Sequence, residues 1–261
     1  MKTTDTSEQG LERLIVSHLA GISEHPPVLA NGVQEPQAVY APGGYVLGRA
    51  SDYNRDVALD VVQLLAFLHA TQPGAVDTLE LGADGVRRTQ FLHRLQGEIT
   101  KRGVVDVLRK GVNHGPVHVD LYRLLPSPGN DAAADAFGKN IFSITRQVRY
   151  SNDLGNELDL VIFINGLPVL TFELKNSLTR QTVADAVVQY QNTRNPKELL
   201  FQPGRCVAHM AVDDAEVRFC TELKGRASWF LPFNQGVDGG AGNPVNPHGL
   251  KTEYLWKEIL R

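Results

Sequence analysis

The feature that most constrains the fold is a pair of apolar segments, joined by a short turn, that also carry charged residues. The segments are residues 157–164 (ELDLVIFI) and 169–176 (VLTFELKN), and the turn is residues 165–168 (NGLP). Their β-branched and aromatic content predicts two strands, and an Asn-Gly pair favours a hairpin. Charged side chains inside apolar strands are costly unless they pair or bind an ion. The charged residues are Asp159, Glu173 and Lys175.

Two acids and a lysine in this arrangement suit phosphodiester hydrolysis. A divalent cation held by carboxylates polarises a phosphate and lowers the pKa of a bound water, while an ammonium group stabilises developing negative charge. Strand alternation puts Glu173 and Lys175 on one face, with Val169 and Thr171. The alternative is an ordinary ion pair of Glu173 and Lys175 at a strand end, with Asp159 near the sheet edge, because such short spacings also arise by chance.

The register of the hairpin decides whether the two acids can share a cation. A two-residue loop would pair Ile164 with Leu167 and place Asp159 and Glu173 on opposite faces. We therefore predict a three-residue loop or a bulge. Ile164 would then pair with Pro168, and Asp159 would lie opposite Glu173.

The hairpin resembles the PD-(D/E)XK nuclease core, and more narrowly the N-terminal domain of the restriction (R) subunit of type I restriction enzymes. The residues that carry the resemblance are Leu158-Asp159-Leu160, Asn165-Gly166-Leu167-Pro168 and Phe172-Glu173-Leu174-Lys175-Asn176. Segments on either side match the same family in the same order. They are residues 108–112 (LRKGV) and 140–147 (NIFSITRQ) before the hairpin, and 189–190 (QY), 230–236 (FLPFNQG), 242–244 (GNP) and 252–256 (TEYLW) after it.

The resemblance implies roles for the charged residues. Asp159 and Glu173 would be the metal-binding carboxylates, Lys175 the catalytic lysine, and Mg²⁺ the cofactor. Leu158 stands where the eponymous motif has proline, a departure that the superfamily tolerates.

A helix is expected at about residues 181–194. Its apolar side chains recur at helical spacing, and Thr182 with Asp185 forms a start signal. Related nucleases often carry a Gln-x-x-x-Tyr motif here, whereas Gln189 directly precedes Tyr190 in this chain. Tyr190 is either a core tyrosine with a satisfied hydroxyl or a DNA contact. Gln189 either reaches the metal site or a phosphate, or is simply exposed.

The N-terminal helix, expected from Ser7 to Leu19, offers one more candidate. Several PD-(D/E)XK families place a glutamate of the first helix near the metal, and Glu12 is the better candidate here than Glu8. The alternative is that acids near a helix N-terminus complement the helix dipole.

Composition indicates a soluble cytoplasmic domain. The chain has 261 residues, of which 42% are hydrophobic, enough for one large core or a core plus a small subdomain. No apolar run approaches the roughly 20 residues of a membrane span, and the N-terminus lacks a signal-peptide pattern. Cys206 and Cys220 lie in two expected strands, 205–212 and 216–222, and are expected to be buried thiols. His114 and His118 are separated by Gly-Pro and do not predict a metal site.

The net charge is −3, which by itself does not favour DNA binding. Basic residues cluster in the expected helical segment 84–110, either as a phosphate-tracking surface or as a solvated helix face. They are Arg87, Arg88, Arg94, Lys101, Arg102, Arg109 and Lys110. No phosphate-binding loop of the Gly-x-x-x-x-Gly-Lys-Ser/Thr type occurs, so we expect no ATP hydrolysis by this chain.

These observations predict an α/β fold with a mixed sheet flanked by helices. Residues 1–130 would form a mainly helical N-terminal part, 131–225 the PD-(D/E)XK core, and 226–261 a Gly/Asn/Pro-rich connector with a short helix, leading toward a motor domain absent from this chain. The resemblance implies a Mg²⁺-dependent type I endonuclease whose partners are DNA, the modification and specificity subunits and the ATP-driven motor domains. The alternative is a catalytically silent module that docks DNA or subunits.

Overall fold

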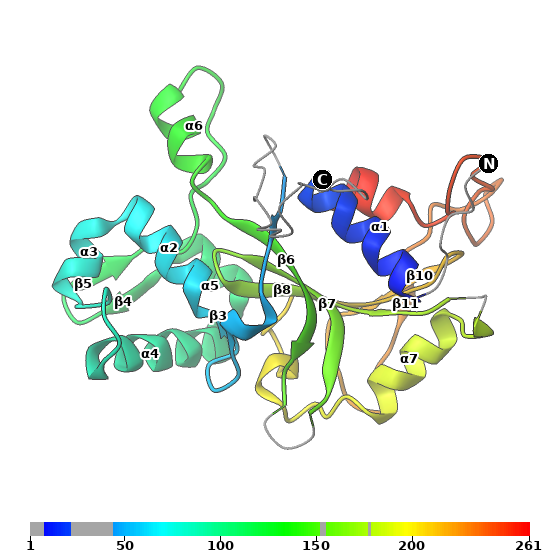
Figure 1. The fold of residues 1–261 in the computed structure, drawn as a ribbon, viewed down its shortest axis with the longest axis horizontal. Coiled ribbons are helices and arrows are strands. Elements are labelled where there is room, and N and C mark those ends of the chain that lie inside the picture. The colour runs from blue at the N-terminus through cyan, green and yellow to red at the C-terminus, as the bar shows by residue number, and fades with distance from the viewer. Residues whose placement is uncertain (1–7, 22–43, 152–154, 177–178) are drawn as a thin grey trace, which may run out of the picture.

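The computed structural model describes residues 8–21, 44–151, 155–176 and 179–261. Its centre is a seven-stranded mixed sheet in the order β1-β6-β7-β8-β9-β10-β11, with helices on both faces (Figure 1). The strands are β1 Val46–Leu47, β6 Phe142–Arg149, β7 Glu157–Ile164, β8 Leu167–Leu174, β9 Ala208–Val212, β10 Val217–Cys220 and β11 Leu231–Pro232. The β1–β6 and β8–β9 pairs are parallel and the other pairs antiparallel. The predicted mixed α/β fold is confirmed.

Two small antiparallel hairpins accompany the main sheet. One joins β2 Tyr53–Asn54 to β3 Leu59–Asp60, and the other joins β4 Val112–His114 to β5 Val117–Val119. The N-terminal part is therefore less purely helical than the sequence predicted, and it also supplies β1 to the main sheet.

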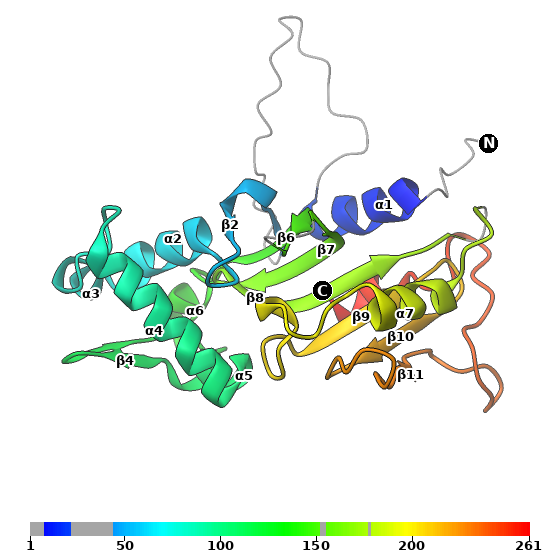
Figure 2. The same cartoon turned by 90° about the horizontal axis from the view of Figure 1, so that it is seen from below.

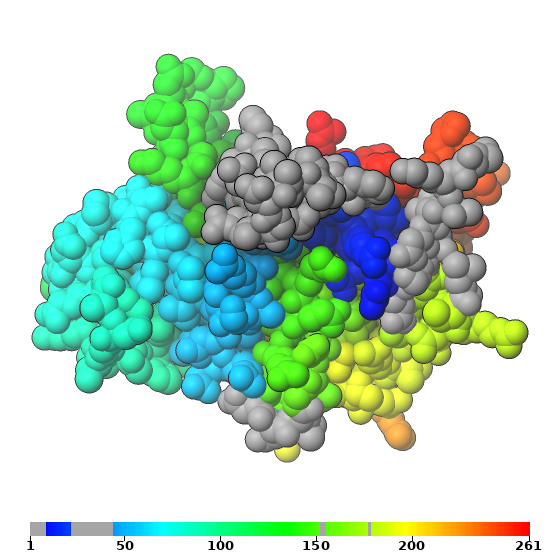
Figure 3. All heavy atoms as spheres, viewed as in Figure 1, coloured from blue at the N-terminus to red at the C-terminus, as the bar shows by residue number. Residues whose placement is uncertain are grey.

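The described residues form seven α-helices, and one of them, α6, stands apart from the others. They are α1 Glu8–Ala20, α2 Val61–Thr71, α3 Pro73–Thr78, α4 Val86–Arg102, α5 Val104–Lys110, α6 Asp131–Phe137 and α7 Val183–Asn192. The predicted helical segment 84–110 is divided at Gly103, where φ is +81°. No residue of α6 is buried, and this helix projects from the body of the molecule (Figure 1, Figure 3). Short 3-10 turns occur at Ala50–Asp52 and Leu199–Phe201.

The two faces of the sheet have different cores. On one face α1 packs over the sheet, and its Leu11 joins the largest hydrophobic cluster together with Phe172 of β8 and Trp256 near the C-terminus. On the opposite face lies α7, whose Tyr190 joins a second cluster with Phe163 of β7 (Figure 2). Because the larger cluster draws on all three predicted segments, they pack as one body, and the predicted division of the chain stays a prediction.

The C-terminal part follows its predicted outline. The hairpin of β9 and β10 is present, and both cysteines are free and buried, as predicted. A connector follows β11, and the chain then forms a π-helical turn at Leu255–Ile259, where an ordinary short helix was expected. None of the described helices is long and apolar enough to cross a membrane.

The β7–β8 turn is tighter than the register argument predicted. Ile164 pairs with Leu167 across the two-residue turn, so the predicted pairing of Ile164 with Pro168 is wrong. Asn165 and Gly166 have φ values of +50° and +81°, as a primed hairpin turn requires. A Cβ at Gly166 would lie 2.3 Å from a backbone oxygen at the start of α2, so only glycine fits there.

A bulge then restores the register that the acids need. The pairing shifts by one residue midway along the hairpin, where Val169 is the extra residue of β8, and beyond the shift Leu160 lies opposite Phe172. Continued by one residue, this register places Asp159 opposite Glu173. The predicted bulge is confirmed, and the register beyond it brings the two acids opposite each other on adjacent strands.

Candidate functional site

Asp159 lies where the recorded pairing of β7 with β8 ends. The last pair is Leu160 with Phe172. Asp159 precedes Leu160, and its Oδ2 accepts a hydrogen bond from the backbone N–H of Leu174 at 2.7 Å. The carboxylate of Asp159 is thereby fixed beside β8, and the residue remains partly exposed.

Glu173 lies deep in the sheet with none of its surface exposed. Its Oε1 accepts a hydrogen bond from Nε of Arg194 at 2.6 Å, whereas its Oε2 has no hydrogen-bond partner among the described residues. Burial raises the pKa of Glu173 to about 7, opposed by the hydrogen bond from Arg194, and the neighbouring charge of Asp159 raises it further. Burial therefore disfavours the charged form of this carboxylate, and the hydrogen bond from Arg194 favours it.

Lys175 follows on the same strand. Its backbone N–H donates to the carbonyl of Val212 in β9, and its side chain is largely buried. The positive charge of Lys175 lowers the pKa of Glu173, so its ammonium group acts on the acid site. The structure thus brings the three predicted residues Asp159, Glu173 and Lys175 together. The simpler alternative, a solvated ion pair at a strand end, does not fit a carboxylate that is fully buried between central strands.

Arg194 is a member of the site that the sequence reasoning missed. Besides its bond to Glu173, its Nη1 donates to the Tyr150 hydroxyl at 3.2 Å and its Nη2 to the Glu157 carbonyl at 2.9 Å. The guanidinium carbon also lies 5.5 Å from the centre of the Tyr150 ring. Burial alone would lower the pKa of Arg194, but the interaction with Glu173 raises it, so the arginine is charged. The only signal in the sequence was a cation at the end of the predicted helix, and in the structure Arg194 follows α7 by two residues.

The two carboxylates fit a hard divalent cation. Such ions take oxygen ligands, and Mg²⁺ in particular is often held by one or two carboxylates, with waters and substrate phosphates completing its shell. Asp159 and Glu173 provide this pair from adjacent strands, and the unpartnered, buried Oε2 of Glu173 is an acceptor in need of a partner. Among the described residues, no group of three or more His, Cys, Asp or Glu side chains is placed to hold a metal ion.

Glu12 lies on α1 and is 5% exposed. Its carboxylate accepts hydrogen bonds from Nε of Arg146 and from Nε2 of Gln147, the latter at 2.7 Å. The register of β6 with β7 places Gln147 alongside Asp159, so Glu12 is linked to the edge of the site through this glutamine. An auxiliary role for Glu12 stays a prediction.

Tyr190 takes the position of a core tyrosine. It is fully buried, and its hydroxyl lies 2.9 Å from Oγ1 of Thr171, which in turn lies 2.8 Å from Nδ1 of His209. Burial lowers the pKa of His209 to about 3, so this histidine is neutral. Gln189 is half-buried on α7, and its predicted auxiliary role is not decided by this placement.

The basic cluster of the N-terminal part is largely neutralised by nearby acids. Most of its members form ion pairs along α4 and α5, which lie at the opposite end of the molecule from α7 (Figure 2). The pairs are Arg87–Glu80, Arg88–Asp84, Arg94–Glu98, Arg102–Glu98, Arg102–Asp106 and Lys110–Asp106. This pattern favours the solvated-face alternative over a phosphate-tracking surface.

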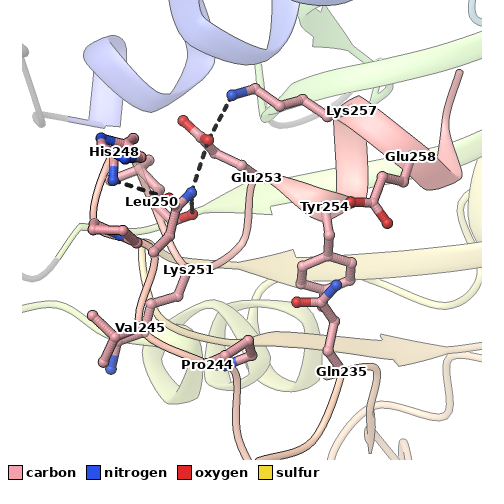
Figure 4. A pocket seen from close by; sticks show the side chains of 12 residues that line it. Gln235, Pro244, Val245, His248, Leu250, Lys251, Glu253, Tyr254, Lys257 and Glu258 are labelled. Atoms are coloured by element: carbon pink, nitrogen blue, oxygen red, sulfur yellow. Dashed lines mark hydrogen bonds and ion pairs between the residues drawn. The ribbon is translucent and has the colours of Figure 1, made fainter.

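A shallow hollow of about 400 Å³ occurs elsewhere, between the connector and the C-terminal turn (Figure 4). Its lining includes His248, Lys251 and Tyr254, and a 2.6 Å ion pair joins Lys257 to Glu253 at its rim. None of the predicted site residues lines this hollow. The acid site lies elsewhere, on β7 and β8 beside Arg194.

A mixed sheet flanked by helices, with two acids on adjacent central strands followed by a lysine, is the arrangement of the PD-(D/E)XK-like α/β class. The chain also matches the family described as Type I restriction enzyme R protein N terminus over residues 89–228. Because this match covers more than half of the chain, the chain belongs to that family, and the predicted resemblance is confirmed. The matched range contains the hairpin, α7 and Arg194. No curated protein matches the chain significantly.

Proposed function

We propose that this chain is the metal-dependent endonuclease domain of a type I restriction R subunit and hydrolyses phosphodiester bonds of DNA. The observation that carries the proposal is the buried Glu173 carboxylate, of which one oxygen has no hydrogen-bond partner among the described residues and which the register of β7 and β8 places opposite Asp159. Family membership supplies the context of a restriction enzyme.

The roles of the residues follow from their positions. Asp159 and Glu173 would hold Mg²⁺, and the bond from the Leu174 amide keeps the Asp159 carboxylate in place. When bound, Mg²⁺ polarises the phosphate and lowers the pKa of an attacking water. Lys175 contributes a positive charge beside the acids, where it stabilises the negative charge that develops on the phosphate oxygens. The partly exposed Asp159 marks the side from which DNA reaches the site.

The rival proposal is a silent docking module with the same fold. A docking surface gains nothing from a carboxylate buried in a central strand, and burial raises the pKa of Glu173 to about 7. A carboxylate buried at a cost in free energy, with a pKa shifted in this way, is typical of functional sites. We therefore favour the enzyme.

The family context extends the proposal to partners. DNA would be the substrate, the modification and specificity subunits would supply recognition, and the motor domains of a full-length R subunit would supply translocation, all in the cytoplasm. The chain has no phosphate-binding loop in its sequence, so ATP would act only through the motor domains.

Variants of the three central residues test the proposal in the assembled enzyme. Asp159→Asn, Glu173→Gln and Lys175→Met should each lower Mg²⁺-dependent plasmid cleavage by about 10²–10³-fold or more, the usual effect of removing one group that stabilises a transition state. Glu157→Gln is a matched control, because this acid of the same strand forms a surface pair with Arg149. Cleavage at the parental rate by all three variants would show that the site is misassigned.

A further inference from the structure

The Glu173 carboxylate is held asymmetrically. Oε1 is bonded to Arg194, and Oε2 is not hydrogen-bonded to any described residue. Both oxygens are buried in the same side chain, so the difference comes from the single partner and not from exposure. A carboxylate that is fixed at one oxygen has lost the freedom to rotate and presents its other oxygen in one direction.

Arg194 is itself anchored at every part of its guanidinium group. Nε bonds Glu173, Nη1 bonds Tyr150, and Nη2 bonds the carbonyl of Glu157 at the start of β7. The side chain is 6% exposed, and the Tyr150 ring lies beside it. The planar fork of arginine can make these three bonds at once, whereas a lysine ammonium on a flexible stem cannot hold the same geometry.

We infer that Arg194 is a positioning residue for the metal ligand Glu173, fixing Oε1 so that Oε2 is the oxygen offered to the cation. This inference rests on the proposed function. In metal sites, the groups that orient a ligand contribute strongly to affinity, and their removal typically weakens metal binding by about 10–100-fold. Arg194 bonds to Oε1 alone and leaves the other oxygen to the metal.

Two other roles for Arg194 make different predictions. If the arginine only balances a buried charge, its replacement lowers stability and leaves metal affinity unchanged. If it competes with the cation for Glu173, its replacement tightens metal binding. The effect on Mg²⁺ affinity, measured by itself, therefore separates all three roles.

The experiment is a calorimetric Mg²⁺ titration of the full chain, with a thermal melt of each variant in the absence of metal. The variants are Arg194→Gln and Arg194→Lys, and Arg205→Lys is the matched control. Arg205 is also a buried arginine, but it bonds the backbone carbonyls of Val57 and Gln96, away from the acids.

We expect Arg194→Gln to raise the Mg²⁺ dissociation constant by about 10–100-fold. Arg194→Lys should raise it as well, because a lysine ammonium cannot hold the same geometry, and Arg205→Lys should lower the melting temperature without moving the dissociation constant. Should Arg194→Gln fail to fold, Tyr150→Phe serves instead: it removes one anchoring bond, keeps the ring and should give a smaller rise. An unchanged or tighter Mg²⁺ affinity in a folded Arg194 variant would overturn the inference.

Glu173→Gln in the same titration separates this inference from the proposed function. Suppose that the parent binds Mg²⁺, that Glu173→Gln abolishes this binding, and that Arg194→Gln does not change it. In that case only the positioning role fails. If the parent itself binds no Mg²⁺ under conditions where it is folded, the proposed function fails, and the inference fails with it.

Discussion

Two buried polar clusters lie two residues apart on the same face of β8, and they differ in how well their atoms are satisfied. Thr171 forms one with Tyr190 and His209, and the named side-chain atoms bond one another in a neutral network. Glu173 forms the other with Arg194, where a charged pair is buried and one carboxylate oxygen has no hydrogen-bond partner in the part of the chain that the structure describes.

The difference distinguishes a cluster that stabilises the fold, around Thr171, from one that we assign to function, around Glu173. A fully satisfied buried network specifies one packing of the core, whereas a partly satisfied one is costly and persists only where something else requires it. Both clusters place polar side chains in an apolar strand, so polarity alone would not tell them apart. The unpartnered oxygen of Glu173, opposite a second carboxylate, is what distinguishes the site.

The largest effect on stability should come from truncating Glu173. Glu173→Ala leaves Arg194 buried without its carboxylate, and breaking a buried pair from one side costs about 3–5 kcal/mol. The double variant Glu173→Ala/Arg194→Met removes the stranded charge and should recover part of this loss. Urea denaturation of the metal-free chain measures both. Equal stability of Glu173→Ala and the parent would show that the pair is not effectively buried, and the contrast with the Thr171 cluster would disappear.

The sequence predicted the parts of the site that depend on local pattern. Strand alternation placed Glu173 and Lys175 on one face, and the Thr182–Asp185 capping box marks the start of α7. The bulge was predictable because only a register shift brings Asp159 opposite Glu173. The position of the shift, after a tight two-residue turn, was not predicted. A three-residue loop and a bulge both bring Asp159 opposite Glu173, and the sequence pattern does not distinguish between them.

The contacts that complete both clusters were beyond the sequence pattern. Arg194 is 21 residues from Glu173, and His209 is 38 residues from Thr171. Contacts of this kind depend on how α7 crosses the sheet and on the parallel β8–β9 register, and neither follows from periodicity. For the same reason, the sequence left Tyr190 open between a core position and a DNA contact.

The two clusters should respond to pH with opposite signs. The pKa of His209 is lowered from 6.5 to about 3, so its stabilising effect is present above 6.5 and is lost as the pH falls toward 3. By linkage, the loss from this histidine should be about 2 kcal/mol at pH 5. The pKa of Glu173 is raised from 4.5 to about 7, so its contribution is present below 4.5 and is lost as the pH rises through 7.

Stability measured from pH 4.5 to 7.5 without metal separates these contributions. His209→Gln should remove the loss of stability on the acid side, and Glu173→Gln should remove the loss on the neutral side. Each variant serves as the control for the other. Parallel pH profiles for the parent and both variants would contradict the assignment of either group.

The smallest effect should come from Tyr190→Phe, which decides between the alternatives left open for this residue. The ring stays in the core, and the variant loses one neutral hydrogen bond to Thr171, whose hydroxyl keeps His209 as a partner. The expected cost is about 1 kcal/mol, the usual net value of such a bond. Because the Tyr190 hydroxyl bonds Thr171 inside the core, Mg²⁺ affinity and cleavage by the folded protein should not change. A fall in cleavage without a fall in stability would instead make Tyr190 part of the site, and the satisfied cluster would then belong to the catalytic machinery as well.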